Sequence, residues 1–505
     1  MRGSRRRIDL KAIARRAMER YGFLPAFPPE VLHEAELLRE DVQEFSGDTR
    51  DLRPLLWSSI DNIDSEDLDQ IEYCEQSENG GVRVLVAIAD VDHYVKKGTA
   101  IDRHALANGT SVYLGFETFP MLPDRLSKGV SSLLPLQDRH AIVIEFAVMQ
   151  DGELNFGGIY PALVRNKAKL VYEEIGEWLE GKSGIPDAVR TVHGLEEQLR
   201  LQAEVAEMLR HHRMAQGALD LETLEPVPVV EGGEVRSLVL QEQNTARRII
   251  EELMVAANRT MVHFLGQERI PMLQRIVRVP KNWAGIVETA ARYGFGLPER
   301  PEAKALARFL DERRRADPER FPDLSLAIVK LMGPGEYVPF VPGEIPIGHF
   351  ALQVREYTHS TAPNRRYVDI VNQRLIKSLL AGTPLTYSTE ELDELAAHLT
   401  DRDKSAEKAA RFARKVAAAI LLEDRIGDAF EGIVTGAAEK GTYTRILDPP
   451  AEGRVVENER GLRVGDRILV RLLRTLPEEG FIDFACVRKV ENHASAIEID
   501  RSARK

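Results

Sequence analysis

Five carboxylates lie within ten residues near the start of the chain, in the segment DNIDSEDLDQ from Asp61 to Gln70. A fold must leave this negative charge in water or supply a counter-ion, because burying unpaired charge is costly. On an extended segment Asp67 and Asp69 point to one face, since strand side chains alternate, and Asp61 can fold back onto that face. Such oxygen ligands suit magnesium, which water and substrate phosphates usually complete. The segment predicts a metal site for phosphoryl chemistry or, as for most isolated DxD sequences, a solvated acidic turn.

Length and composition narrow the class of protein. With 505 residues, 43% of them apolar, the chain is long enough for about three globular domains. Cys74 and Cys486 lie too far apart to indicate a zinc site or a disulfide framework, so we expect a reducing cytoplasm. The basic N-terminus lacks an apolar core, which argues against a secretory signal, and no apolar stretch is long enough to predict a membrane span. The net charge of −12 argues mildly against nucleic-acid binding, although basic residues gather locally.

Apolar periodicity predicts an α+β fold. Two short helices are expected over 9–21 and 29–44, as a helix-turn-helix that binds nucleic acid or as a helical cap on the main domain. Residues 82–90 alternate as a strand, and hairpins are expected to turn at Asp151-Gly152 and Gly232-Gly233. A helix that Asn244 and Thr245 can cap should run through about Leu265, followed by an exposed helix over 301–316 and a longer helical region over 388–425.

The last seventy residues change character. Short strands separated by glycine and charged turns predict a five-stranded OB barrel, a fold that stacks bases on aromatic side chains and follows phosphates with basic ones. The candidates are Phe430, Tyr443, Arg445 and Arg467, each of which could equally be a core or ordinary surface residue. We therefore expect a helical segment over 1–48, a catalytic domain over 49–425, an OB barrel over 426–495 and a basic tail over 496–505.

Seven motifs, in one order, resemble the RNB catalytic domain of the ribonuclease II and ribonuclease R family. They are DNIDSEDLDQ, IADVDHYV, GTSVYLGFETFPMLPDRLSKGVSSLLP, KLVYEE, GALDLE, RRIIEELMVAANR and HFALQVREYTHSTAPNRRYVDIVNQRL. The resemblance covers roughly 50–425, and the OB barrel stands where the family carries its RNA-binding barrel. It implies a processive, hydrolytic 3′-to-5′ exoribonuclease that degrades single-stranded RNA to 5′-nucleoside monophosphates and a short end product. Magnesium is the implied cofactor, with manganese as the alternative.

The resemblance also assigns roles to residues of this chain. It implies catalytic roles for Asp69, Arg365 and Glu407; metal binding by Asp61, Asp67, Asp69 and Gln70; and RNA contacts by Tyr113, Tyr172, Leu221, Glu251 and Arg366, with Phe430 and Tyr443 added from the barrel. Arg365 follows Pro363 at the apparent start of a helix, so its guanidinium can add to the helix's positive end beside a phosphate. The alternative for Arg365 is a structural ion pair with Asp369.

Three departures from the family pattern carry their own predictions. Gln70 stands where many members have an aspartate, which predicts weaker metal affinity. Leu221 stands where many have a phenylalanine that stacks on RNA, which predicts an end product of different length. Only about 50 residues precede the catalytic core, where the family usually has two cold-shock barrels, which predicts a more open channel entrance.

Two other functions stay open on the sequence alone. One is an RNA-binding pseudonuclease scaffold whose catalysis is impaired through Gln70, and the other is a metal phosphoesterase acting on small nucleotides. For the preferred exoribonuclease, the expected partner is single-stranded RNA, including RNA with 3′ overhangs. We expect a cytoplasmic monomer without membrane contact.

Overall fold

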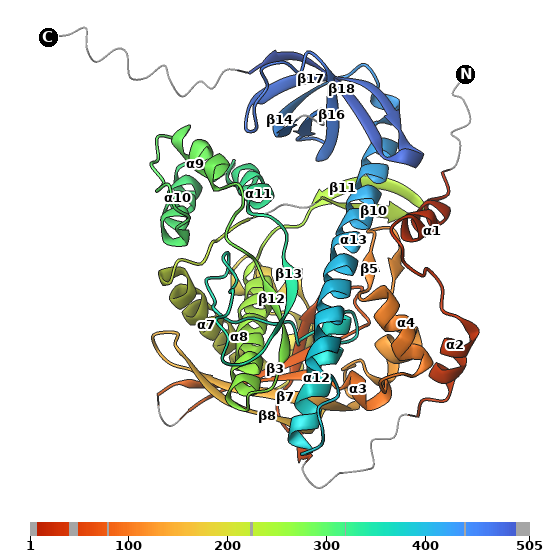
Figure 1. The fold of residues 1–505 in the computed structure, drawn as a ribbon, viewed down its shortest axis with the longest axis vertical. Helices are drawn as coiled ribbons and strands as arrows, with labels where there is room; N and C mark the ends of the chain where they lie inside the picture. The colour runs from red at the N-terminus through yellow and green to blue at the C-terminus, as the bar shows by residue number, and fades with distance from the viewer. Residues whose placement is uncertain are drawn as a thin grey trace, which may run out of the picture.

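The computed structural model describes residues 8–39, 49–77, 80–222, 226–318, 320–438 and 441–490. The predicted basic tail over 496–505 lies outside the described residues. Two N-terminal helices, a large α+β part and a C-terminal barrel follow one another along the chain (Figure 1). The predicted α+β class is confirmed.

A seven-stranded sheet forms the base of the α+β part. Its strand order is β1-β8-β7-β4-β3-β2-β9. The strands are β1 (Arg50–Asp51), β2 (Ser58–Asp61), β3 (Gln70–Gln76), β4 (Val82–Ala89), β7 (Asp138–Val148), β8 (Leu154–Arg165) and β9 (Ala168–Val171). The predicted hairpin at Asp151-Gly152 is the β7–β8 connection, where Gly152 has a φ of +80° that favours glycine. Adjacent strands from β8 to β2 are antiparallel, whereas β1 and β9 join the edges in parallel.

Long helices pack over this sheet because each carries an apolar stripe. In α8 (Thr245–Gln267), Asn244 caps the first turn by accepting the Arg247 N–H at 2.9 Å, and Ile249 and Leu253 lie in the buried stripe, as predicted. Helix α7 (Leu195–Ala215) packs against α8 and β3. Shorter helices connect the strands. They are α3 (Val91–Tyr94), α4 (Ala100–Asn108), α5 (Tyr172–Leu179), α6 (Asp187–Arg190) and the π-helix Leu126–Val130.

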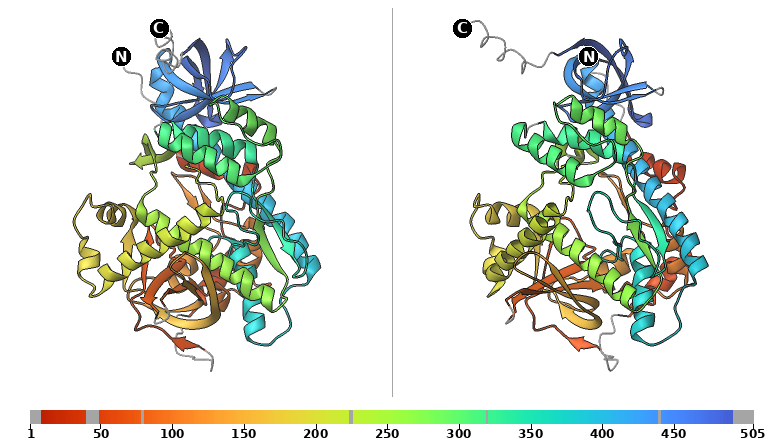
Figure 2. Two further views of the ribbon diagram at one scale, coloured as in Figure 1. Left: turned by 90° about the vertical axis from the view of Figure 1, so that its left-hand side faces the viewer. Right: turned by 60° about the vertical axis from the view of Figure 1, so that its left-hand side comes forward.

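Three helices, α9 (Trp283–Ala291), α10 (Ala303–Ala316) and α11 (Phe321–Met332), pack around their own core and lie directly below the barrel (Figure 2). The prediction that 301–316 is an exposed helix was wrong. Leu306, Phe309 and Leu310 of α10 are buried, because its many arginines occupy one face and leave the other apolar. The ribbon β12 (Met272–Ile276) with β13 (Glu336–Phe340) connects this part to the rest.

The N-terminal helices pack onto the main body. Helix α1 (Leu10–Arg20) contacts α13, and α2 (Pro29–Glu36) contacts α4, where Glu34 accepts the Ala100 N–H at 2.6 Å. Helix α2 ends at Glu36, earlier than the predicted limit of 44, and residues 40–48 lie outside the described ranges. The buried face of each of these two helices packs on the main body. This is the helical cap, one of the two arrangements that the sequence predicted.

The C-terminal strands close into the predicted five-stranded barrel, in the order β14-β15-β16-β18-β17. They are β14 (Ala429–Ala438), β15 (Gly441–Ile446), β16 (Ala451–Glu457), β17 (Arg467–Leu476) and β18 (Phe481–Lys489). Helix α13 (Thr389–Leu422) runs from the sheet to the barrel and packs against both the hairpin β10 (Pro226–Glu231)–β11 (Glu234–Leu240) and the barrel strands (Figure 1). Within the described ranges, no helix is both long and apolar enough to cross a membrane.

Candidate active site

The acidic segment forms the connection between β2 and β3. Asp61 ends β2, Asp67 and Asp69 lie in the loop that enters β3, and Gln70 is the first residue of that strand. The loop is fixed through its backbone, since the Leu68 N–H donates to Ser132 Oγ at 2.9 Å and the Leu68 carbonyl accepts the Leu133 N–H at 3.0 Å. The segment is therefore not a solvated acidic turn, which was the alternative prediction, because Asp69 is only 2% exposed.

Asp69 is held by residues almost 300 positions later in the chain. The Asn364 N–H donates to Asp69 Oδ1 at 2.8 Å, and Arg365 Nε lies 3.4 Å from Asp69 Oδ2. Both residues belong to the turn that precedes α12 (Tyr367–Leu380). The alternative pairing of Arg365 with Asp369 was wrong, because that ion pair, at 2.8 Å, is made by Arg366.

Burial outweighs the positive charge of Arg365 in the electrostatics of the cluster. Burial raises the pKa of Asp69 to about 8 and that of Asp61 to about 7, although the positive charge of Arg365 opposes both shifts. Asp61 Oδ2 and Asp69 Oδ2 are buried and have no hydrogen-bond partner among the described residues. In these same residues, no three His, Cys, Asp or Glu side chains form a ready-made metal cage. The unpartnered oxygens fit a magnesium ion that takes its other ligands from water and phosphate.

Tyr113 lies beside these carboxylates. Its hydroxyl donates to Asp67 Oδ2 at 3.2 Å, and its side chain remains 45% exposed. Tyr113 ends the short strand β5 (Val112–Tyr113), which pairs with β6 (Thr118–Phe119). The Ser111 N–H donates to the Arg365 carbonyl at 2.9 Å, so the backbone fixes the tyrosine next to the arginine.

Three predicted RNA contacts line one cavity of about 410 Å³: Tyr172, Leu221 and Glu251. Arg247 also lines it and lies 4.4 Å from the Tyr172 ring centroid. Burial raises the pKa of Glu251, while Arg213 opposes the shift. Burial raises the pKa of Tyr172 most, and the negative charge of Asp61 raises it next. Tyr172 therefore lies near Asp61, and the cavity that it lines adjoins the carboxylate cluster.

Other predicted residues lie elsewhere. Glu407 is exposed on α13 and interacts electrostatically with Arg275, which pairs with Asp403 at 2.9 Å. Phe430 is 5% exposed and packs edge-on against Phe484 in the barrel core, so its ring offers no free face for stacking.

Tyr443, in contrast, is half-buried on the barrel, with Lys415 Nζ 5.5 Å from its ring centroid. Of the two barrel aromatics proposed for RNA contact, it is the more accessible. Arg366, another predicted RNA contact, uses its guanidinium for the ion pair with Asp369.

Sequence reasoning missed one residue that is bonded to Asp69 and one buried acid on β3. Asn364 acts through its backbone N–H, which no side-chain pattern could reveal. Glu72 is 0% exposed, and neither of its carboxyl oxygens has a hydrogen-bond partner among the described residues. The period of two in a strand could have indicated Glu72, because it shares a face of β3 with Gln70.

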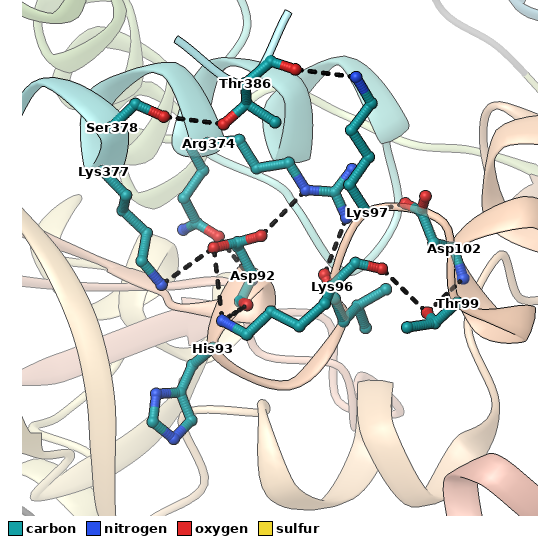
Figure 3. A network of polar contacts seen from close by, with 12 residues as sticks. Asp92, His93, Lys96, Lys97, Thr99, Asp102, Arg374, Lys377, Ser378 and Thr386 are labelled. Carbon is teal, nitrogen blue, oxygen red and sulfur yellow. Dashed lines mark hydrogen bonds and ion pairs between the residues drawn. The ribbon is translucent and has the colours of Figure 1, made fainter. Parts of the chain in front are cut away.

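A buried network fixes the helix that follows Arg365. Arg374 of α12 is 2% exposed and donates to Asp92 at 2.9 Å and to Asp102 at 2.8 Å. Lys377, one turn further along the helix, pairs with Asp90 at 2.8 Å. It also pairs with Asp92 at 3.2 Å (Figure 3). These bonds join α12 to α3 and α4, and so set where the turn carrying Arg365 lies.

Comparisons with known proteins agree with this architecture. Residues 49–382 match the RNB domain, and residues 428–487 match the RNase II-type exonuclease C-terminal S1 domain. The chain is 29% identical over 503 residues to ribonuclease R of Thermotoga maritima, a match that covers 92% of this chain and 69% of the relative.

Two solved structures share the fold. Mycoplasma genitalium RNase R in complex with ribose-methylated single-stranded RNA has a TM-score of 0.86 at 24% identity, over 95% of this chain and 78% of that one. Yeast Ssd1, a pseudonuclease, has a TM-score of 0.67 at 17% identity, over 92% of this chain and 58% of that one. Because the RNB match covers more than half of the sequence, the chain belongs to the RNB-domain exoribonuclease family of ribonuclease II and ribonuclease R.

Proposed function

We propose that the chain is a magnesium-dependent, hydrolytic 3′-to-5′ exoribonuclease that degrades single-stranded RNA processively to 5′-nucleoside monophosphates and a short end product. The observation that carries the proposal is that Arg365 lies against Asp69, almost 300 residues earlier in the chain, in a cluster where buried oxygens of Asp61 and Asp69 accept no hydrogen bond from the described residues. We also expect the protein to act as a cytoplasmic monomer.

The residues of the site have distinct tasks in this proposal. Asp69 is immobilised by the Asn364 N–H, and Asp61 and Asp69 are both under the electrostatic influence of Arg365 and Asp67. A divalent cation supplies polarisation of the scissile phosphate and activation of water when bound. Arg365 is 47% exposed and contacts Asp69 through Nε, so its remaining N–H donors are available to a phosphate. Planar donors of this kind stabilise charge that develops on phosphoryl oxygens.

RNA selection belongs to the aromatic and acidic residues beside the carboxylates. The exposed ring of Tyr113 offers a sequence-tolerant stacking surface, which suits an enzyme that must accept every base. Tyr172 and Glu251 line the adjoining cavity, where a phenol and a carboxylate can bond the 2′-hydroxyl that distinguishes RNA from DNA.

The pseudonuclease scaffold is the second candidate, because yeast Ssd1 shows that a pseudonuclease can have this fold. The exoribonuclease is favoured because the carboxylates and Arg365 are retained and assembled in this chain, whereas a lost active site needs none of these contacts. Ribonuclease R of M. genitalium, solved with single-stranded and with double-stranded RNA, supports RNA as the substrate class.

The test is degradation of a 5′-labelled single-stranded RNA in magnesium by wild type, Asp69→Asn and the control Asp64→Asn. Asp64 is an exposed carboxylate of the same acidic segment. We expect wild type and the control to leave a short labelled product, and Asp69→Asn to be slower by at least about 100-fold, the loss typical of removing one transition-state contact.

Three other results of this experiment would contradict the proposal. Binding of RNA by wild type without shortening would identify a scaffold, and action on mononucleotides alone would identify a phosphoesterase. Equal degradation by wild type and Asp69→Asn would show that the chemistry occurs elsewhere.

A further inference from the structure

A second cavity, of about 760 Å³, is lined by residues of β8, α8 and the segment 346–356. Helix α8 packs against β8, and the cavity lies along their contact (Figure 1). Its volume is within the range of roughly 300–1,000 Å³ that is typical of small-molecule sites. The cavity shares no lining residue with the one that Tyr172 and Glu251 line, and it contains none of the site residues predicted from the sequence. It is therefore a separate candidate site.

Arg259 lines this cavity without an acidic partner. On α8 it lies four residues before His263, so both side chains occupy the same face of the helix. Within the described part of the chain no carboxylate raises the pKa of Arg259, whereas burial and the positive charge of Arg213 both lower it. A half-buried guanidinium without a counter-ion favours a bound anion, because burying unpaired charge is costly.

Two stacked rings form another wall of the cavity. Phe156 of β8 and His263 lie nearly parallel, with ring centroids 4.1 Å apart and an angle of 18° between the planes. Both side chains line the cavity and are half-buried. A bulge in β8 follows Phe156 directly, and there a Cβ on Gly157 would meet the Glu145 carbonyl oxygen at 2.5 Å. An aromatic surface fixed in this way can stack on a planar base of any sequence.

The third wall, the segment 346–356, contains strained backbone. Gln353 has a φ of +53°, in the left-handed region that residues other than glycine rarely adopt. The turn is fixed by its own bonds, since the Gln353 N–H donates to the His349 carbonyl at 2.9 Å and the His349 N–H donates to the Val354 carbonyl at 2.8 Å. Strained backbone of this kind is found where segments hold ligands.

The charged side chains of the lining suit a phosphate and a sugar. Arg355 adds a second guanidinium, and Glu356 is the one carboxylate among the described residues that line the cavity. Two arginines against one glutamate leave the lining positive. Guanidinium groups bind phosphate oxygens through paired hydrogen bonds, and a carboxylate accepts the hydroxyls of a ribose.

We propose that this cavity binds a nucleoside monophosphate. Arg259 and Arg355 hold the phosphate. The stacked rings carry the base, and Glu356 accepts the ribose hydroxyls. Inorganic phosphate can make only the first of these contacts and a nucleoside only the others, so both serve as comparison ligands. The inference goes beyond the proposed function and does not depend on it, because binding in this cavity requires no cleavage.

The first measurement is equilibrium dialysis of radiolabelled adenosine 5′-monophosphate against the full chain in EDTA, so that no divalent cation occupies the Asp69 cluster. Arg259→Gln should weaken binding by about 10-fold or more, since it removes a charged hydrogen-bond donor to the phosphate. Phe156→Leu should weaken it by about 10-fold, because base–aromatic stacking is lost. The control Arg248→Gln, which changes an exposed arginine of the same helix, should bind as wild type does. Adenosine and inorganic phosphate should each bind wild type more weakly than the nucleotide.

Two further variants separate this cavity from the active site and from an effect on folding. Arg365→Ala removes the phosphate donor at the carboxylate cluster and should leave binding of the nucleotide unchanged. Without nucleotide, Arg259→Gln should melt no lower than wild type, whereas the rise in melting temperature on adding the nucleotide should shrink. If Arg259→Gln does not fold, Arg355→Gln gives the same test at an exposed position.

Several results would overturn the inference. Unchanged binding in Arg259→Gln, or no binding by wild type, would exclude the cavity as a nucleotide site. Binding that is lost in Arg365→Ala and kept in Arg259→Gln would place the nucleotide at the carboxylate cluster.

The comparison ligands can also contradict it. Inorganic phosphate that binds as tightly as the nucleotide, with Phe156→Leu unaffected, would show an anion site that takes no base. Displacement of the nucleotide by an RNA strand without a terminal phosphate would show that the cavity takes the strand instead. None of these results bears on whether wild type shortens labelled RNA, so the proposed function stands or fails separately.

Discussion

Arg365 and Arg366 are adjacent arginines with opposite surroundings. The Arg365 side chain is 47% exposed and faces Asp69, whereas Arg366 pairs with Asp369, which is 1% exposed. We predict that Arg365→Ala lowers kcat by about 10²- to 10³-fold with little change in melting temperature, because it removes donors to the phosphate. Arg366→Ala should instead cost about 3–5 kcal/mol of unfolding free energy, since it leaves a buried carboxylate unpaired. Urea denaturation and single-turnover RNA cleavage on both variants check this, and two variants that behave alike would contradict it.

His349 makes stability depend on pH. Burial lowers the pKa of His349 to about 4, with a further contribution from Arg275, and its Nδ1 accepts the Leu352 N–H at 3.2 Å. Since the unfolded histidine has a pKa near 6.5, the unfolded state binds the proton first as the pH falls. The stabilisation is therefore complete above about pH 6.5 and is lost progressively towards pH 4, by at most about 2 kcal/mol at pH 5. His349→Asn keeps the acceptor, so its melting temperature should fall less than that of wild type between pH 7 and pH 5; an equal fall would exclude His349 as a source of the pH dependence.

At the scale of elements, the position of the active-site turn depends on how α12 is fixed to α3 and α4. Arg374 is the centre of that junction, with bonds to Asp92 and Asp102 (Figure 3). We predict that Arg374→Met lowers the unfolding free energy by about 3–5 kcal/mol, because it leaves buried carboxylates without their main partner. Lys97→Met is the matched control: its ion pair with Glu391 is exposed and should contribute less than about 1 kcal/mol. Urea denaturation compares the two, and similar midpoints would show that the network does not hold the helix.

At the scale of the whole molecule, the N-terminal helices lie against the main body of the protein. In the described residues before the RNB match, α1 and α2 pack against α13 and α4. We predict an entrance open enough for duplexed RNA to approach, so that a hairpin with a 3′ overhang is shortened to within a few nucleotides of the duplex. Gel analysis of the end product checks this against a single strand with the same 3′ sequence. An overhang that stays much longer than the end product of the single strand would contradict the open entrance.

The sequence by itself determined the local elements, because their causes are local. Turns at Asp151-Gly152 and Gly232-Gly233, the Asn244 cap and the closing barrel strands all form where the pattern predicted them. The motifs likewise named the candidate site residues, whose catalytic roles stay predictions. Periodicity shows which face of an element a side chain occupies, but it does not show what packs against that face.

Tertiary packing decided the partners. Only the folded chain shows that Arg365 lies against Asp69 while Arg366 holds Asp369. The side chains of these two adjacent arginines point in different directions, and the sequence pattern does not distinguish them. The burial of α10 and of Phe430 was likewise set by neighbouring elements. The Asn364 N–H that holds Asp69 shows the same effect, because groups from distant segments determine which buried carboxyls are bonded.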